Sequence, residues 1–207
     1  MIHVVREAAA DEAAGTIVLL HGRGADEHDL LPLLGVLDPK RRLRGITVGG
    51  PLALPPGGKH WYAVHRVGFP DPATFDPTYA ELARFLDDDL GLDWSRTVVG
   101  GFSQGGVMSY ALGLGAGRPV PAGILAMSCF VPQTPGWRAD LDSRAGLPVA
   151  HVHGEGDPVI PVSFGREARD LLAPNVALTY REFPGGHNVD PRLLPALADW
   201  LAARFSG

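Results

Sequence analysis

Short apolar runs alternate with polar or glycine-rich segments along the chain, and the runs differ in their period. β-Branched and aliphatic residues at strand spacing predict strands at residues 2–6, 16–20, 46–48, 97–99, 123–128, 149–153 and 177–183. Apolar residues at helical spacing predict helices at residues 27–34, 78–90, 107–114, 162–172 and 191–205. Such alternation of strands and helices is typical of an α/β fold with a mostly parallel sheet and helices on both faces.

One long segment, residues 50–77, shows neither period and is rich in proline, so it is predicted to be irregular. Trp61, Tyr62 and Phe69 lie in this segment, although a solvated linker would not favour aromatic side chains. We expect the segment to form one wall of a binding pocket. The alternative is that Trp61 and Tyr62 cap the hydrophobic core, and both interpretations can hold together.

Composition narrows the class of protein. The 207 residues fit one domain, 1–207, which is too short to include a separate lid domain. The net charge of −5, without a basic cluster, argues against a nucleic-acid partner, and no apolar run approaches the roughly 20 residues that span a bilayer. With no leader pattern at Met1, we expect a cytoplasmic protein without stable membrane insertion. The single cysteine, Cys129, is expected to be a buried small residue.

The stretch from 97 to 108 carries the most specific chemical signal. A β-branched run leads into Gly101-Phe102-Ser103-Gln104-Gly105, a Gly-x-Ser-x-Gly pattern followed by a helical segment. A serine on such a sharp strand-to-helix turn is exposed at the end of the sheet as a nucleophile. The backbone N–H of Gln104, at the start of the helix, is placed to stabilise a developing oxyanion. The alternative is a glycine-rich connection with an incidental serine.

A second glycine loop follows the early strand at 16–20. The backbone N–H of Arg23, between two glycines, is predicted to be the other oxyanion donor. A phosphate-binding loop is disfavoured because the Gly-Lys-Ser/Thr ending is absent.

Two groups of side chains are of types that bind metal ions. They are His21, Asp26, His28 and Asp29 in the glycine loop, and His151 with His153 on one predicted strand. The loop group lacks a recognised ligand spacing, and the strand pair lacks a third ligand nearby. We therefore predict no metal and no other cofactor.

An acid and a histidine follow Ser103 in the order that a hydrolase triad requires. Asp157 lies on a tight loop after the strand at 149–153, and His187 lies on a glycine-rich loop after the last strand. His187 would accept the proton of Ser103, and the acid would hold the imidazole in the correct tautomer. Glu155 is the rival acid.

The ordered motifs resemble the phospholipase/carboxylesterase family of α/β-hydrolases. The matching blocks are Leu20-His21-Gly22-Arg23-Gly24, Gly101-Phe102-Ser103-Gln104-Gly105-Gly106, His153-Gly154 with Asp157-Pro158-Val159-Ile160-Pro161, Gly186-His187, and the aromatic segment His60-Trp61-Tyr62. The resemblance implies the α/β-hydrolase fold, favours Asp157 over Glu155, and implies hydrolysis of carboxylic esters or thioesters without a cofactor. Ala25 before Asp26, and Asn188 after His187, depart from the usual family pattern.

We therefore predict a serine carboxylesterase that hydrolyses short to medium acyl esters of small molecules through an acyl-enzyme. Trp61, Tyr62, Phe69, Val159 and Ile160 are expected to line its acyl pocket. An acyl-protein thioesterase and a lysophospholipase are alternatives within the same chemistry. A non-catalytic protein that binds a small molecule or partner on a hydrolase fold is the alternative of another class. A homodimer is left open.

Overall fold

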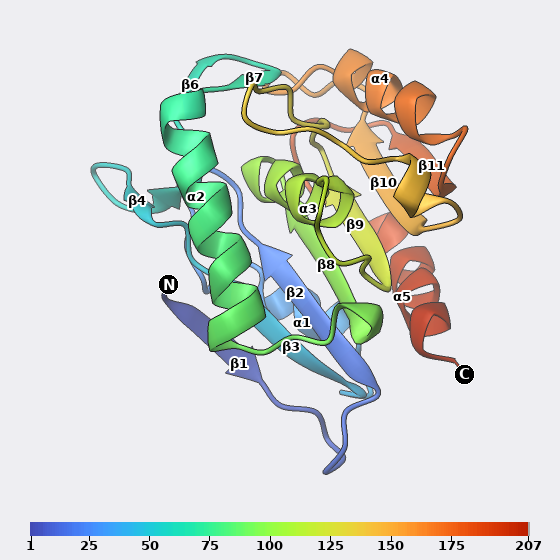
Figure 1. Cartoon of the computed structure of the whole chain (residues 1–207). Coiled ribbons are helices and arrows are strands. Elements are labelled where there is room, and N and C mark those ends of the chain that lie inside the picture. The colour runs from blue at the N-terminus through green and yellow to red at the C-terminus, as the bar shows by residue number, and fades with distance from the viewer. Residues whose placement is uncertain (207) are drawn as a thin grey trace.

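The computed structural model describes residues 1–206, and its centre is one seven-stranded sheet in the order β1-β3-β2-β8-β9-β10-β11 (Figure 1). The strands are β1 (His3–Arg6), β2 (Gly15–Leu20), β3 (Leu43–Val48), β8 (Thr97–Phe102), β9 (Gly123–Met127), β10 (Pro148–Gly154) and β11 (Ala177–Phe183). β1 pairs with β3 antiparallel, whereas all other neighbours pair parallel. The predicted mostly parallel sheet is confirmed.

Helices cover both faces of the sheet because its buried strands present apolar side chains alternately to either side. In β2, Val18 and Leu20 join a hydrophobic cluster with α2 (Pro72–Arg84), α3 (Gln104–Leu114) and α4 (Val162–Leu172). Ile17 and Leu19 join a second cluster with α1 (Leu31–Leu37) and α5 (Leu194–Ala202). In Figure 1, α2 and α3 lie in front of the sheet and α1 lies behind it. Short helical turns occupy Phe85–Asp89 (π), Trp94–Arg96, Asp142–Arg144, Pro191–Leu193 and Ala203–Phe205 (3₁₀).

Two predicted helix starts are wrong. The helix expected from residue 78 begins at Pro72, because proline is pre-organised for the first helical position, and it contains Pro77. The helix expected from residue 27 begins at Leu31. Glu27 is instead a buried turn residue whose carboxylate pairs with Lys59 Nζ at 2.5 Å. Glu27 is of a type that suits a helix N-terminus, but in this structure it forms an ion pair with Lys59.

The segment at 50–77 is more regular than its sequence predicts. It contains two small hairpins, β4 (Leu52–Ala53) with β5 (Lys59–His60) and β6 (Val64–Arg66) with β7 (Phe69–Pro70), before α2 begins. Pairs of two or three residues are too short to give a periodic signal. Among residues 1–206, no helix combines the length and apolar character needed to cross a membrane.

The connection from β8 to α3 leaves no room for side chains at its glycines. A Cβ built on Gly105, in the first turn of α3, would lie 1.9 Å from the carbonyl oxygen of Leu20 at the end of β2. The atom in the way is backbone of a buried strand, which cannot move aside. The first turn of α3 is therefore pressed directly against the carboxyl end of the sheet.

We expect Gly105→Ala to lower the free energy of unfolding by about 1–3 kcal/mol or more, because the new methyl group is overpacked against backbone. Gly35→Ala is the matched control, since Gly35 is also helical but has no atom within 4 Å of the position of a Cβ. It should raise stability by up to about 1 kcal/mol through helix propensity. Urea unfolding followed by circular dichroism checks both, and equal effects of the two substitutions would contradict the close packing.

Candidate active site

Ser103 lies at the turn between β8 and α3 with a backbone conformation that L-residues rarely adopt, φ 55° and ψ −121°. A residue in such a conformation costs of order 1–3 kcal/mol and persists only where its surroundings fix it. Here the Ser103 N–H donates to Met127 O at 2.9 Å, and Val107 N–H donates to Ser103 O at 3.1 Å. The strained turn places the Ser103 hydroxyl within hydrogen-bond distance of His187.

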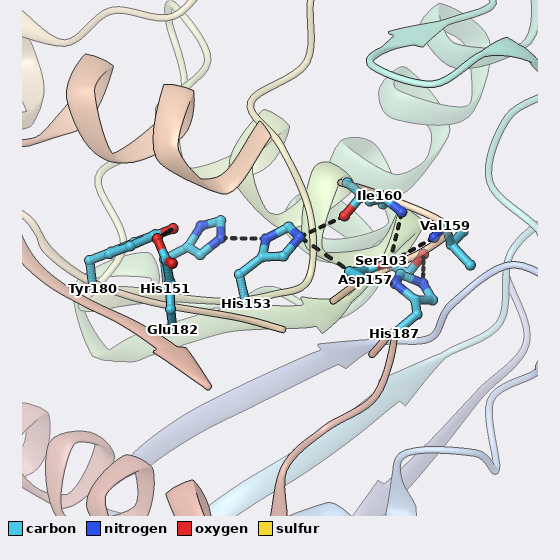
Figure 2. A network of polar contacts seen from close by, with 9 residues as sticks. All are labelled: Ser103, His151, His153, Asp157, Val159, Ile160, Tyr180, Glu182 and His187. Carbon is cyan, nitrogen blue, oxygen red and sulfur yellow. Dashed lines mark hydrogen bonds and ion pairs between the residues drawn. The ribbon is translucent and has the colours of Figure 1, made fainter. Parts of the chain in front are cut away.

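The structure brings Ser103, Asp157 and His187 together at the carboxyl ends of β8, β10 and β11 (Figure 2). His187 Nε2 lies 2.9 Å from Ser103 Oγ, and His187 Nδ1 lies 2.6 Å from Asp157 Oδ2. The rival acid, Glu155, is exposed, whereas Asp157 is the carboxylate that reaches His187. Parallel strands from distant parts of the sequence thus place the three side chains at one edge of the sheet.

Hydrogen bonds to Asp157 fix which nitrogen of His187 carries the proton. The Asp157 carboxylate is fully buried, and its Oδ1 accepts the N–H groups of Val159 and Ile160, both at 2.8 Å. Its Oδ2 accepts from His187 Nδ1, so a neutral His187 leaves Nε2 free to accept the Ser103 hydroxyl proton. The Phe102 ring packs against the His187 imidazole, with ring centroids 4.7 Å apart. This arrangement is chemically able to activate a serine hydroxyl.

The two predicted oxyanion donors lie beside Ser103. Gln104 is the first residue of α3, and an N–H in the first turn of a helix has no intrahelical acceptor. The Arg23 N–H has no acceptor among the hydrogen bonds within residues 1–206. The loop that carries Arg23 approaches closely, since a Cβ built on Gly22 would lie 3.5 Å from Ser103 Cβ. Both amides are therefore available to a ligand at Ser103.

The side chain of Gln104 has a second role that the sequence did not reveal. Its Oε1 accepts the Trp61 N–H at 3.0 Å, and its Nε2 donates to Tyr62 O at 2.9 Å. The Trp61 indole donates to His21 O at 2.9 Å, and the imidazole of His21 accepts the Gly50 N–H at 2.9 Å. These bonds join the serine turn, the Arg23 loop and the aromatic segment into one unit. Gln104 is visible in the elbow motif, but the sequence does not indicate which residues its side chain contacts.

A cleft of about 310 Å³ opens at Ser103. Its lining comprises Arg23, Tyr62, Val64, Arg66, Val67, Gly68, Pro70, Ser103, Gln104, Phe130, Val159 and Ile160. Tyr62, Val159 and Ile160, which the sequence suggests for an acyl pocket, lie in the wall of this cleft.

The other two aromatic residues predicted for the wall do not line this cleft. Trp61 is fully buried behind it, where its indole N–H has a backbone partner. Phe69 is 40% exposed outside the cleft, with the Arg66 guanidinium 3.5 Å from its ring centroid. The apolar wall is completed instead by residues that the sequence did not single out, among them Val64, Val67 and Phe130.

Within residues 1–206, no group of three or more His, Cys, Asp or Glu side chains is arranged to hold a metal ion. His21 is occupied by backbone hydrogen bonds, and His151 and His153 contact each other, with 3.2 Å between Nε2 and Nδ1. Cys129 is fully buried, and this burial raises the pKa of its thiol far above its usual range.

Known proteins resemble this chain over most of its length. A family model described as Phospholipase/Carboxylesterase matches residues 2–204. Acyl-protein thioesterase 1 of Cryptococcus neoformans is 26% identical over 220 residues, which is 90% of each chain. A carboxylesterase structure from Bacillus cereus has a TM-score of 0.83 at 24% identity and covers 98% of this chain and 93% of its own. Acyl-protein thioesterase 2 of Zea mays has a TM-score of 0.77 at 22% identity, with 99% of each chain covered. The two structural likenesses show the same fold.

Replacement of the nucleophile tests the site most directly. We expect Ser103→Ala to lower kcat for an activated ester on the order of a million-fold, because loss of a triad nucleophile has an effect of that size. Ser109→Ala is the matched control in the same helix, since its hydroxyl only donates to Gly105 O. Initial rates with p-nitrophenyl acetate measure both. If Ser103→Ala kept a tenth of the wild-type rate, Ser103 would not be the nucleophile.

The buried histidine pair predicts an acid-sensitive fold. Burial, with a smaller contribution from His153, lowers the pKa of His151 from 6.5 to about 3. The unfolded chain therefore binds a proton that the folded protein does not, and stability is present above about pH 6.5 and lost as the pH falls toward 3. Chemical unfolding between pH 4 and 7 should show a shallower pH dependence for His151→Gln than for wild type. The exposed His28→Gln is the control, and identical slopes for wild type and His151→Gln would refute the effect.

Proposed function

Because the chain belongs to the phospholipase/carboxylesterase family of α/β-hydrolases, we propose that it is a serine carboxylesterase that hydrolyses short to medium acyl esters through an acyl-enzyme. The observation that carries this proposal is the hydrogen-bonded series from Ser103 Oγ to His187 to the buried Asp157 carboxylate, at 2.9 and 2.6 Å. An apolar cleft opens at the same serine.

In the proposed acylation step, Ser103 Oγ attacks the ester carbonyl carbon while its proton moves to His187 Nε2. The carbonyl π electrons move to the oxygen, which accepts hydrogen bonds from the Arg23 and Gln104 N–H groups. Asp157 stabilises the imidazolium that forms at His187. When the intermediate collapses, the bond to the leaving alcohol breaks, and that alcohol takes the proton from His187.

Deacylation repeats the same steps with water. His187 Nε2 accepts a proton from water as its oxygen attacks the acyl carbon, and the Ser103–acyl bond then breaks. The proton passes from His187 to Ser103 Oγ, and the carboxylic acid leaves. His187 thus takes part in each proton transfer of both steps, and water is the second substrate of the reaction.

Thioester hydrolysis is the second candidate, because the chain is similar to a Cryptococcus protein that is named an acyl-protein thioesterase. The same attack by Ser103 serves a thioester, since only the leaving group differs. Lysophospholipids are esters that this chemistry also fits. Paired measurements of kcat/KM on an ester and a thioester of one acyl group distinguish the candidates by their ratio.

A fluorophosphonate probe separates an enzyme from a non-catalytic binding protein. Attack by an activated serine forms an O–P bond and expels fluoride, so the intact mass should rise by one probe residue. Peptide mapping should place the added mass on Ser103, and Ser103→Ala should remain unlabelled. An unlabelled wild-type protein that also leaves a panel of esters unhydrolysed would contradict the proposed function.

The open cleft predicts a limited dependence on acyl length. A buried methylene contributes about 0.8 kcal/mol, roughly four-fold in kcat/KM, whereas an exposed methylene adds almost nothing. With p-nitrophenyl esters from acetyl to palmitoyl, kcat/KM should rise over the first additions and then level off or fall. A steady rise to palmitoyl, or activation at an oil–water interface, would contradict an open cleft for short to medium chains.

A further inference from the structure

Behind the proposed triad, a line of buried polar side chains crosses from helix α3 to the loop that carries Asp157. The Tyr110 hydroxyl lies 2.7 Å from His151 Nδ1, and His151 Nε2 lies 3.2 Å from His153 Nδ1. His153 Nε2 lies 2.8 Å from the carbonyl oxygen of Ile160. Figure 2 shows the two imidazoles in line with Ile160 and Asp157. The reaction steps described above do not use any of these three side chains.

The last acceptor determines the direction of every hydrogen bond in this line. A carbonyl oxygen only accepts, so His153 Nε2 carries the proton, and in a neutral imidazole Nδ1 must then accept. His151 Nε2 is therefore the donor to His153, and His151 Nδ1 accepts from the Tyr110 hydroxyl. Burial lowers the pKa of both histidines and raises that of Tyr110, which keeps all three groups neutral. Each ring is thereby held in a single tautomer.

In the part of the chain that the structure describes, β11 and α4 pack against this line without a hydrogen bond to its imidazoles. Tyr180 of β11 packs against His151 with ring centroids 5.4 Å apart, but its hydroxyl donates to Glu182, which pairs with Arg166. On the other side, α4 presents Gly165, where a Cβ would lie 2.6 Å from His153 Nδ1. A glycine inside a helix lowers helix stability by about 1 kcal/mol relative to alanine. Gly165 is therefore unfavourable for α4 itself, but it leaves space for the two imidazoles.

Ile160 links this line to the proposed acid. Its C=O accepts from His153, while its N–H donates to Asp157 Oδ1 at 2.8 Å. His153 Nε2 is also 3.6 Å from Asp157 Oδ2, the oxygen that faces His187. The Asp157 carboxylate therefore depends for its orientation on a loop that His153 fastens to β10.

We propose that His153 is a positioning residue for ester hydrolysis, and that Tyr110 and His151 orient it so that it holds the 157–160 loop and aims Asp157 at His187. This inference rests on the proposed function, because it assigns a role in the same triad. The groups act through Asp157 and do not touch the substrate, so their loss should affect kcat more than KM.

The test compares two tyrosines that contact the same imidazole. Tyr110→Phe removes the donor to His151, whereas the matched control, Tyr180→Phe, removes a hydroxyl that bonds elsewhere. His153→Leu removes the donor to Ile160, and His153→Gln supplies an amide N–H in its place. The rates of p-nitrophenyl acetate hydrolysis are measured from pH 5 to 9, and circular dichroism confirms that each variant is folded.

We expect Tyr110→Phe and His153→Leu to lower kcat by about 10- to 100-fold, as small displacements of catalytic groups do, with little change in KM. The acid limb of their pH–rate profiles should move to lower pH, because the imidazolium of His187 loses part of its carboxylate stabilisation. Tyr180→Phe should match wild type, and His153→Gln should recover part of the rate lost in His153→Leu.

The inference is overturned if Tyr110→Phe keeps the wild-type kcat and acid limb, or if Tyr180→Phe has the same effect as Tyr110→Phe. Should His153→Leu fail to fold, Tyr110→Phe and His153→Gln decide the question alone. Failure of the proposed function has a different signature, since the wild type would then hydrolyse no ester and take up no fluorophosphonate.

Discussion

A carboxylate without solvent contact is stable only where hydrogen bonds replace the water that it has lost. Asp157 meets this condition through the backbone N–H groups of Val159 and Ile160 and the imidazole of His187. One oxygen is satisfied by the amides of Val159 and Ile160, so only the other faces His187. The two oxygens thus have different hydrogen-bond partners, and this difference determines the geometry of the site at the end of the sheet. The carboxylate sets the tautomer of His187, and this tautomer leaves the unprotonated nitrogen toward Ser103.

The sheet supplies the rigidity that these contacts need. Ser103 holds an unfavourable backbone conformation because β8, β9 and the first turn of α3 meet there without room to relax. The close approach of Gly105 to the end of β2 also brings the Arg23 loop beside the nucleophile. Parallel pairing aligns the carboxyl ends of β2, β8, β10 and β11, and loops that are far apart in sequence converge at one edge.

The sequence predicts the sheet because apolar runs mark its strands. Ser103, Asp157 and His187 can be proposed together because each follows one of these strands within four residues. The predicted helix start at residue 27 and the predicted place of Trp61 in the cleft wall are wrong, because both residues make contacts with distant parts of the chain that the sequence does not reveal. Glu27 suits a helix start but pairs with Lys59. Trp61 lies in a loop but is buried in the hydrophobic core, as the alternative interpretation of the aromatic segment has it. The line from Tyr110 to His153 has no sequence signal, because it depends on how closely α3 and α4 approach β10.

The outer wall of the cleft is built differently from its floor. One side of the cleft comes from Ser103, Gln104 of α3 and loop residues such as Phe130 and Ile160. Val64, Arg66 and Pro70 belong instead to the small β6–β7 hairpin, a two-stranded sheet that exposes Val64 and Phe69. Loops of this kind accept insertions and substitutions more readily than sheet strands. In the proposed esterase, part of the wall that would contact the acyl chain therefore lies in a short loop segment, where substitutions can change the shape of the cleft without touching Ser103, Asp157 or His187.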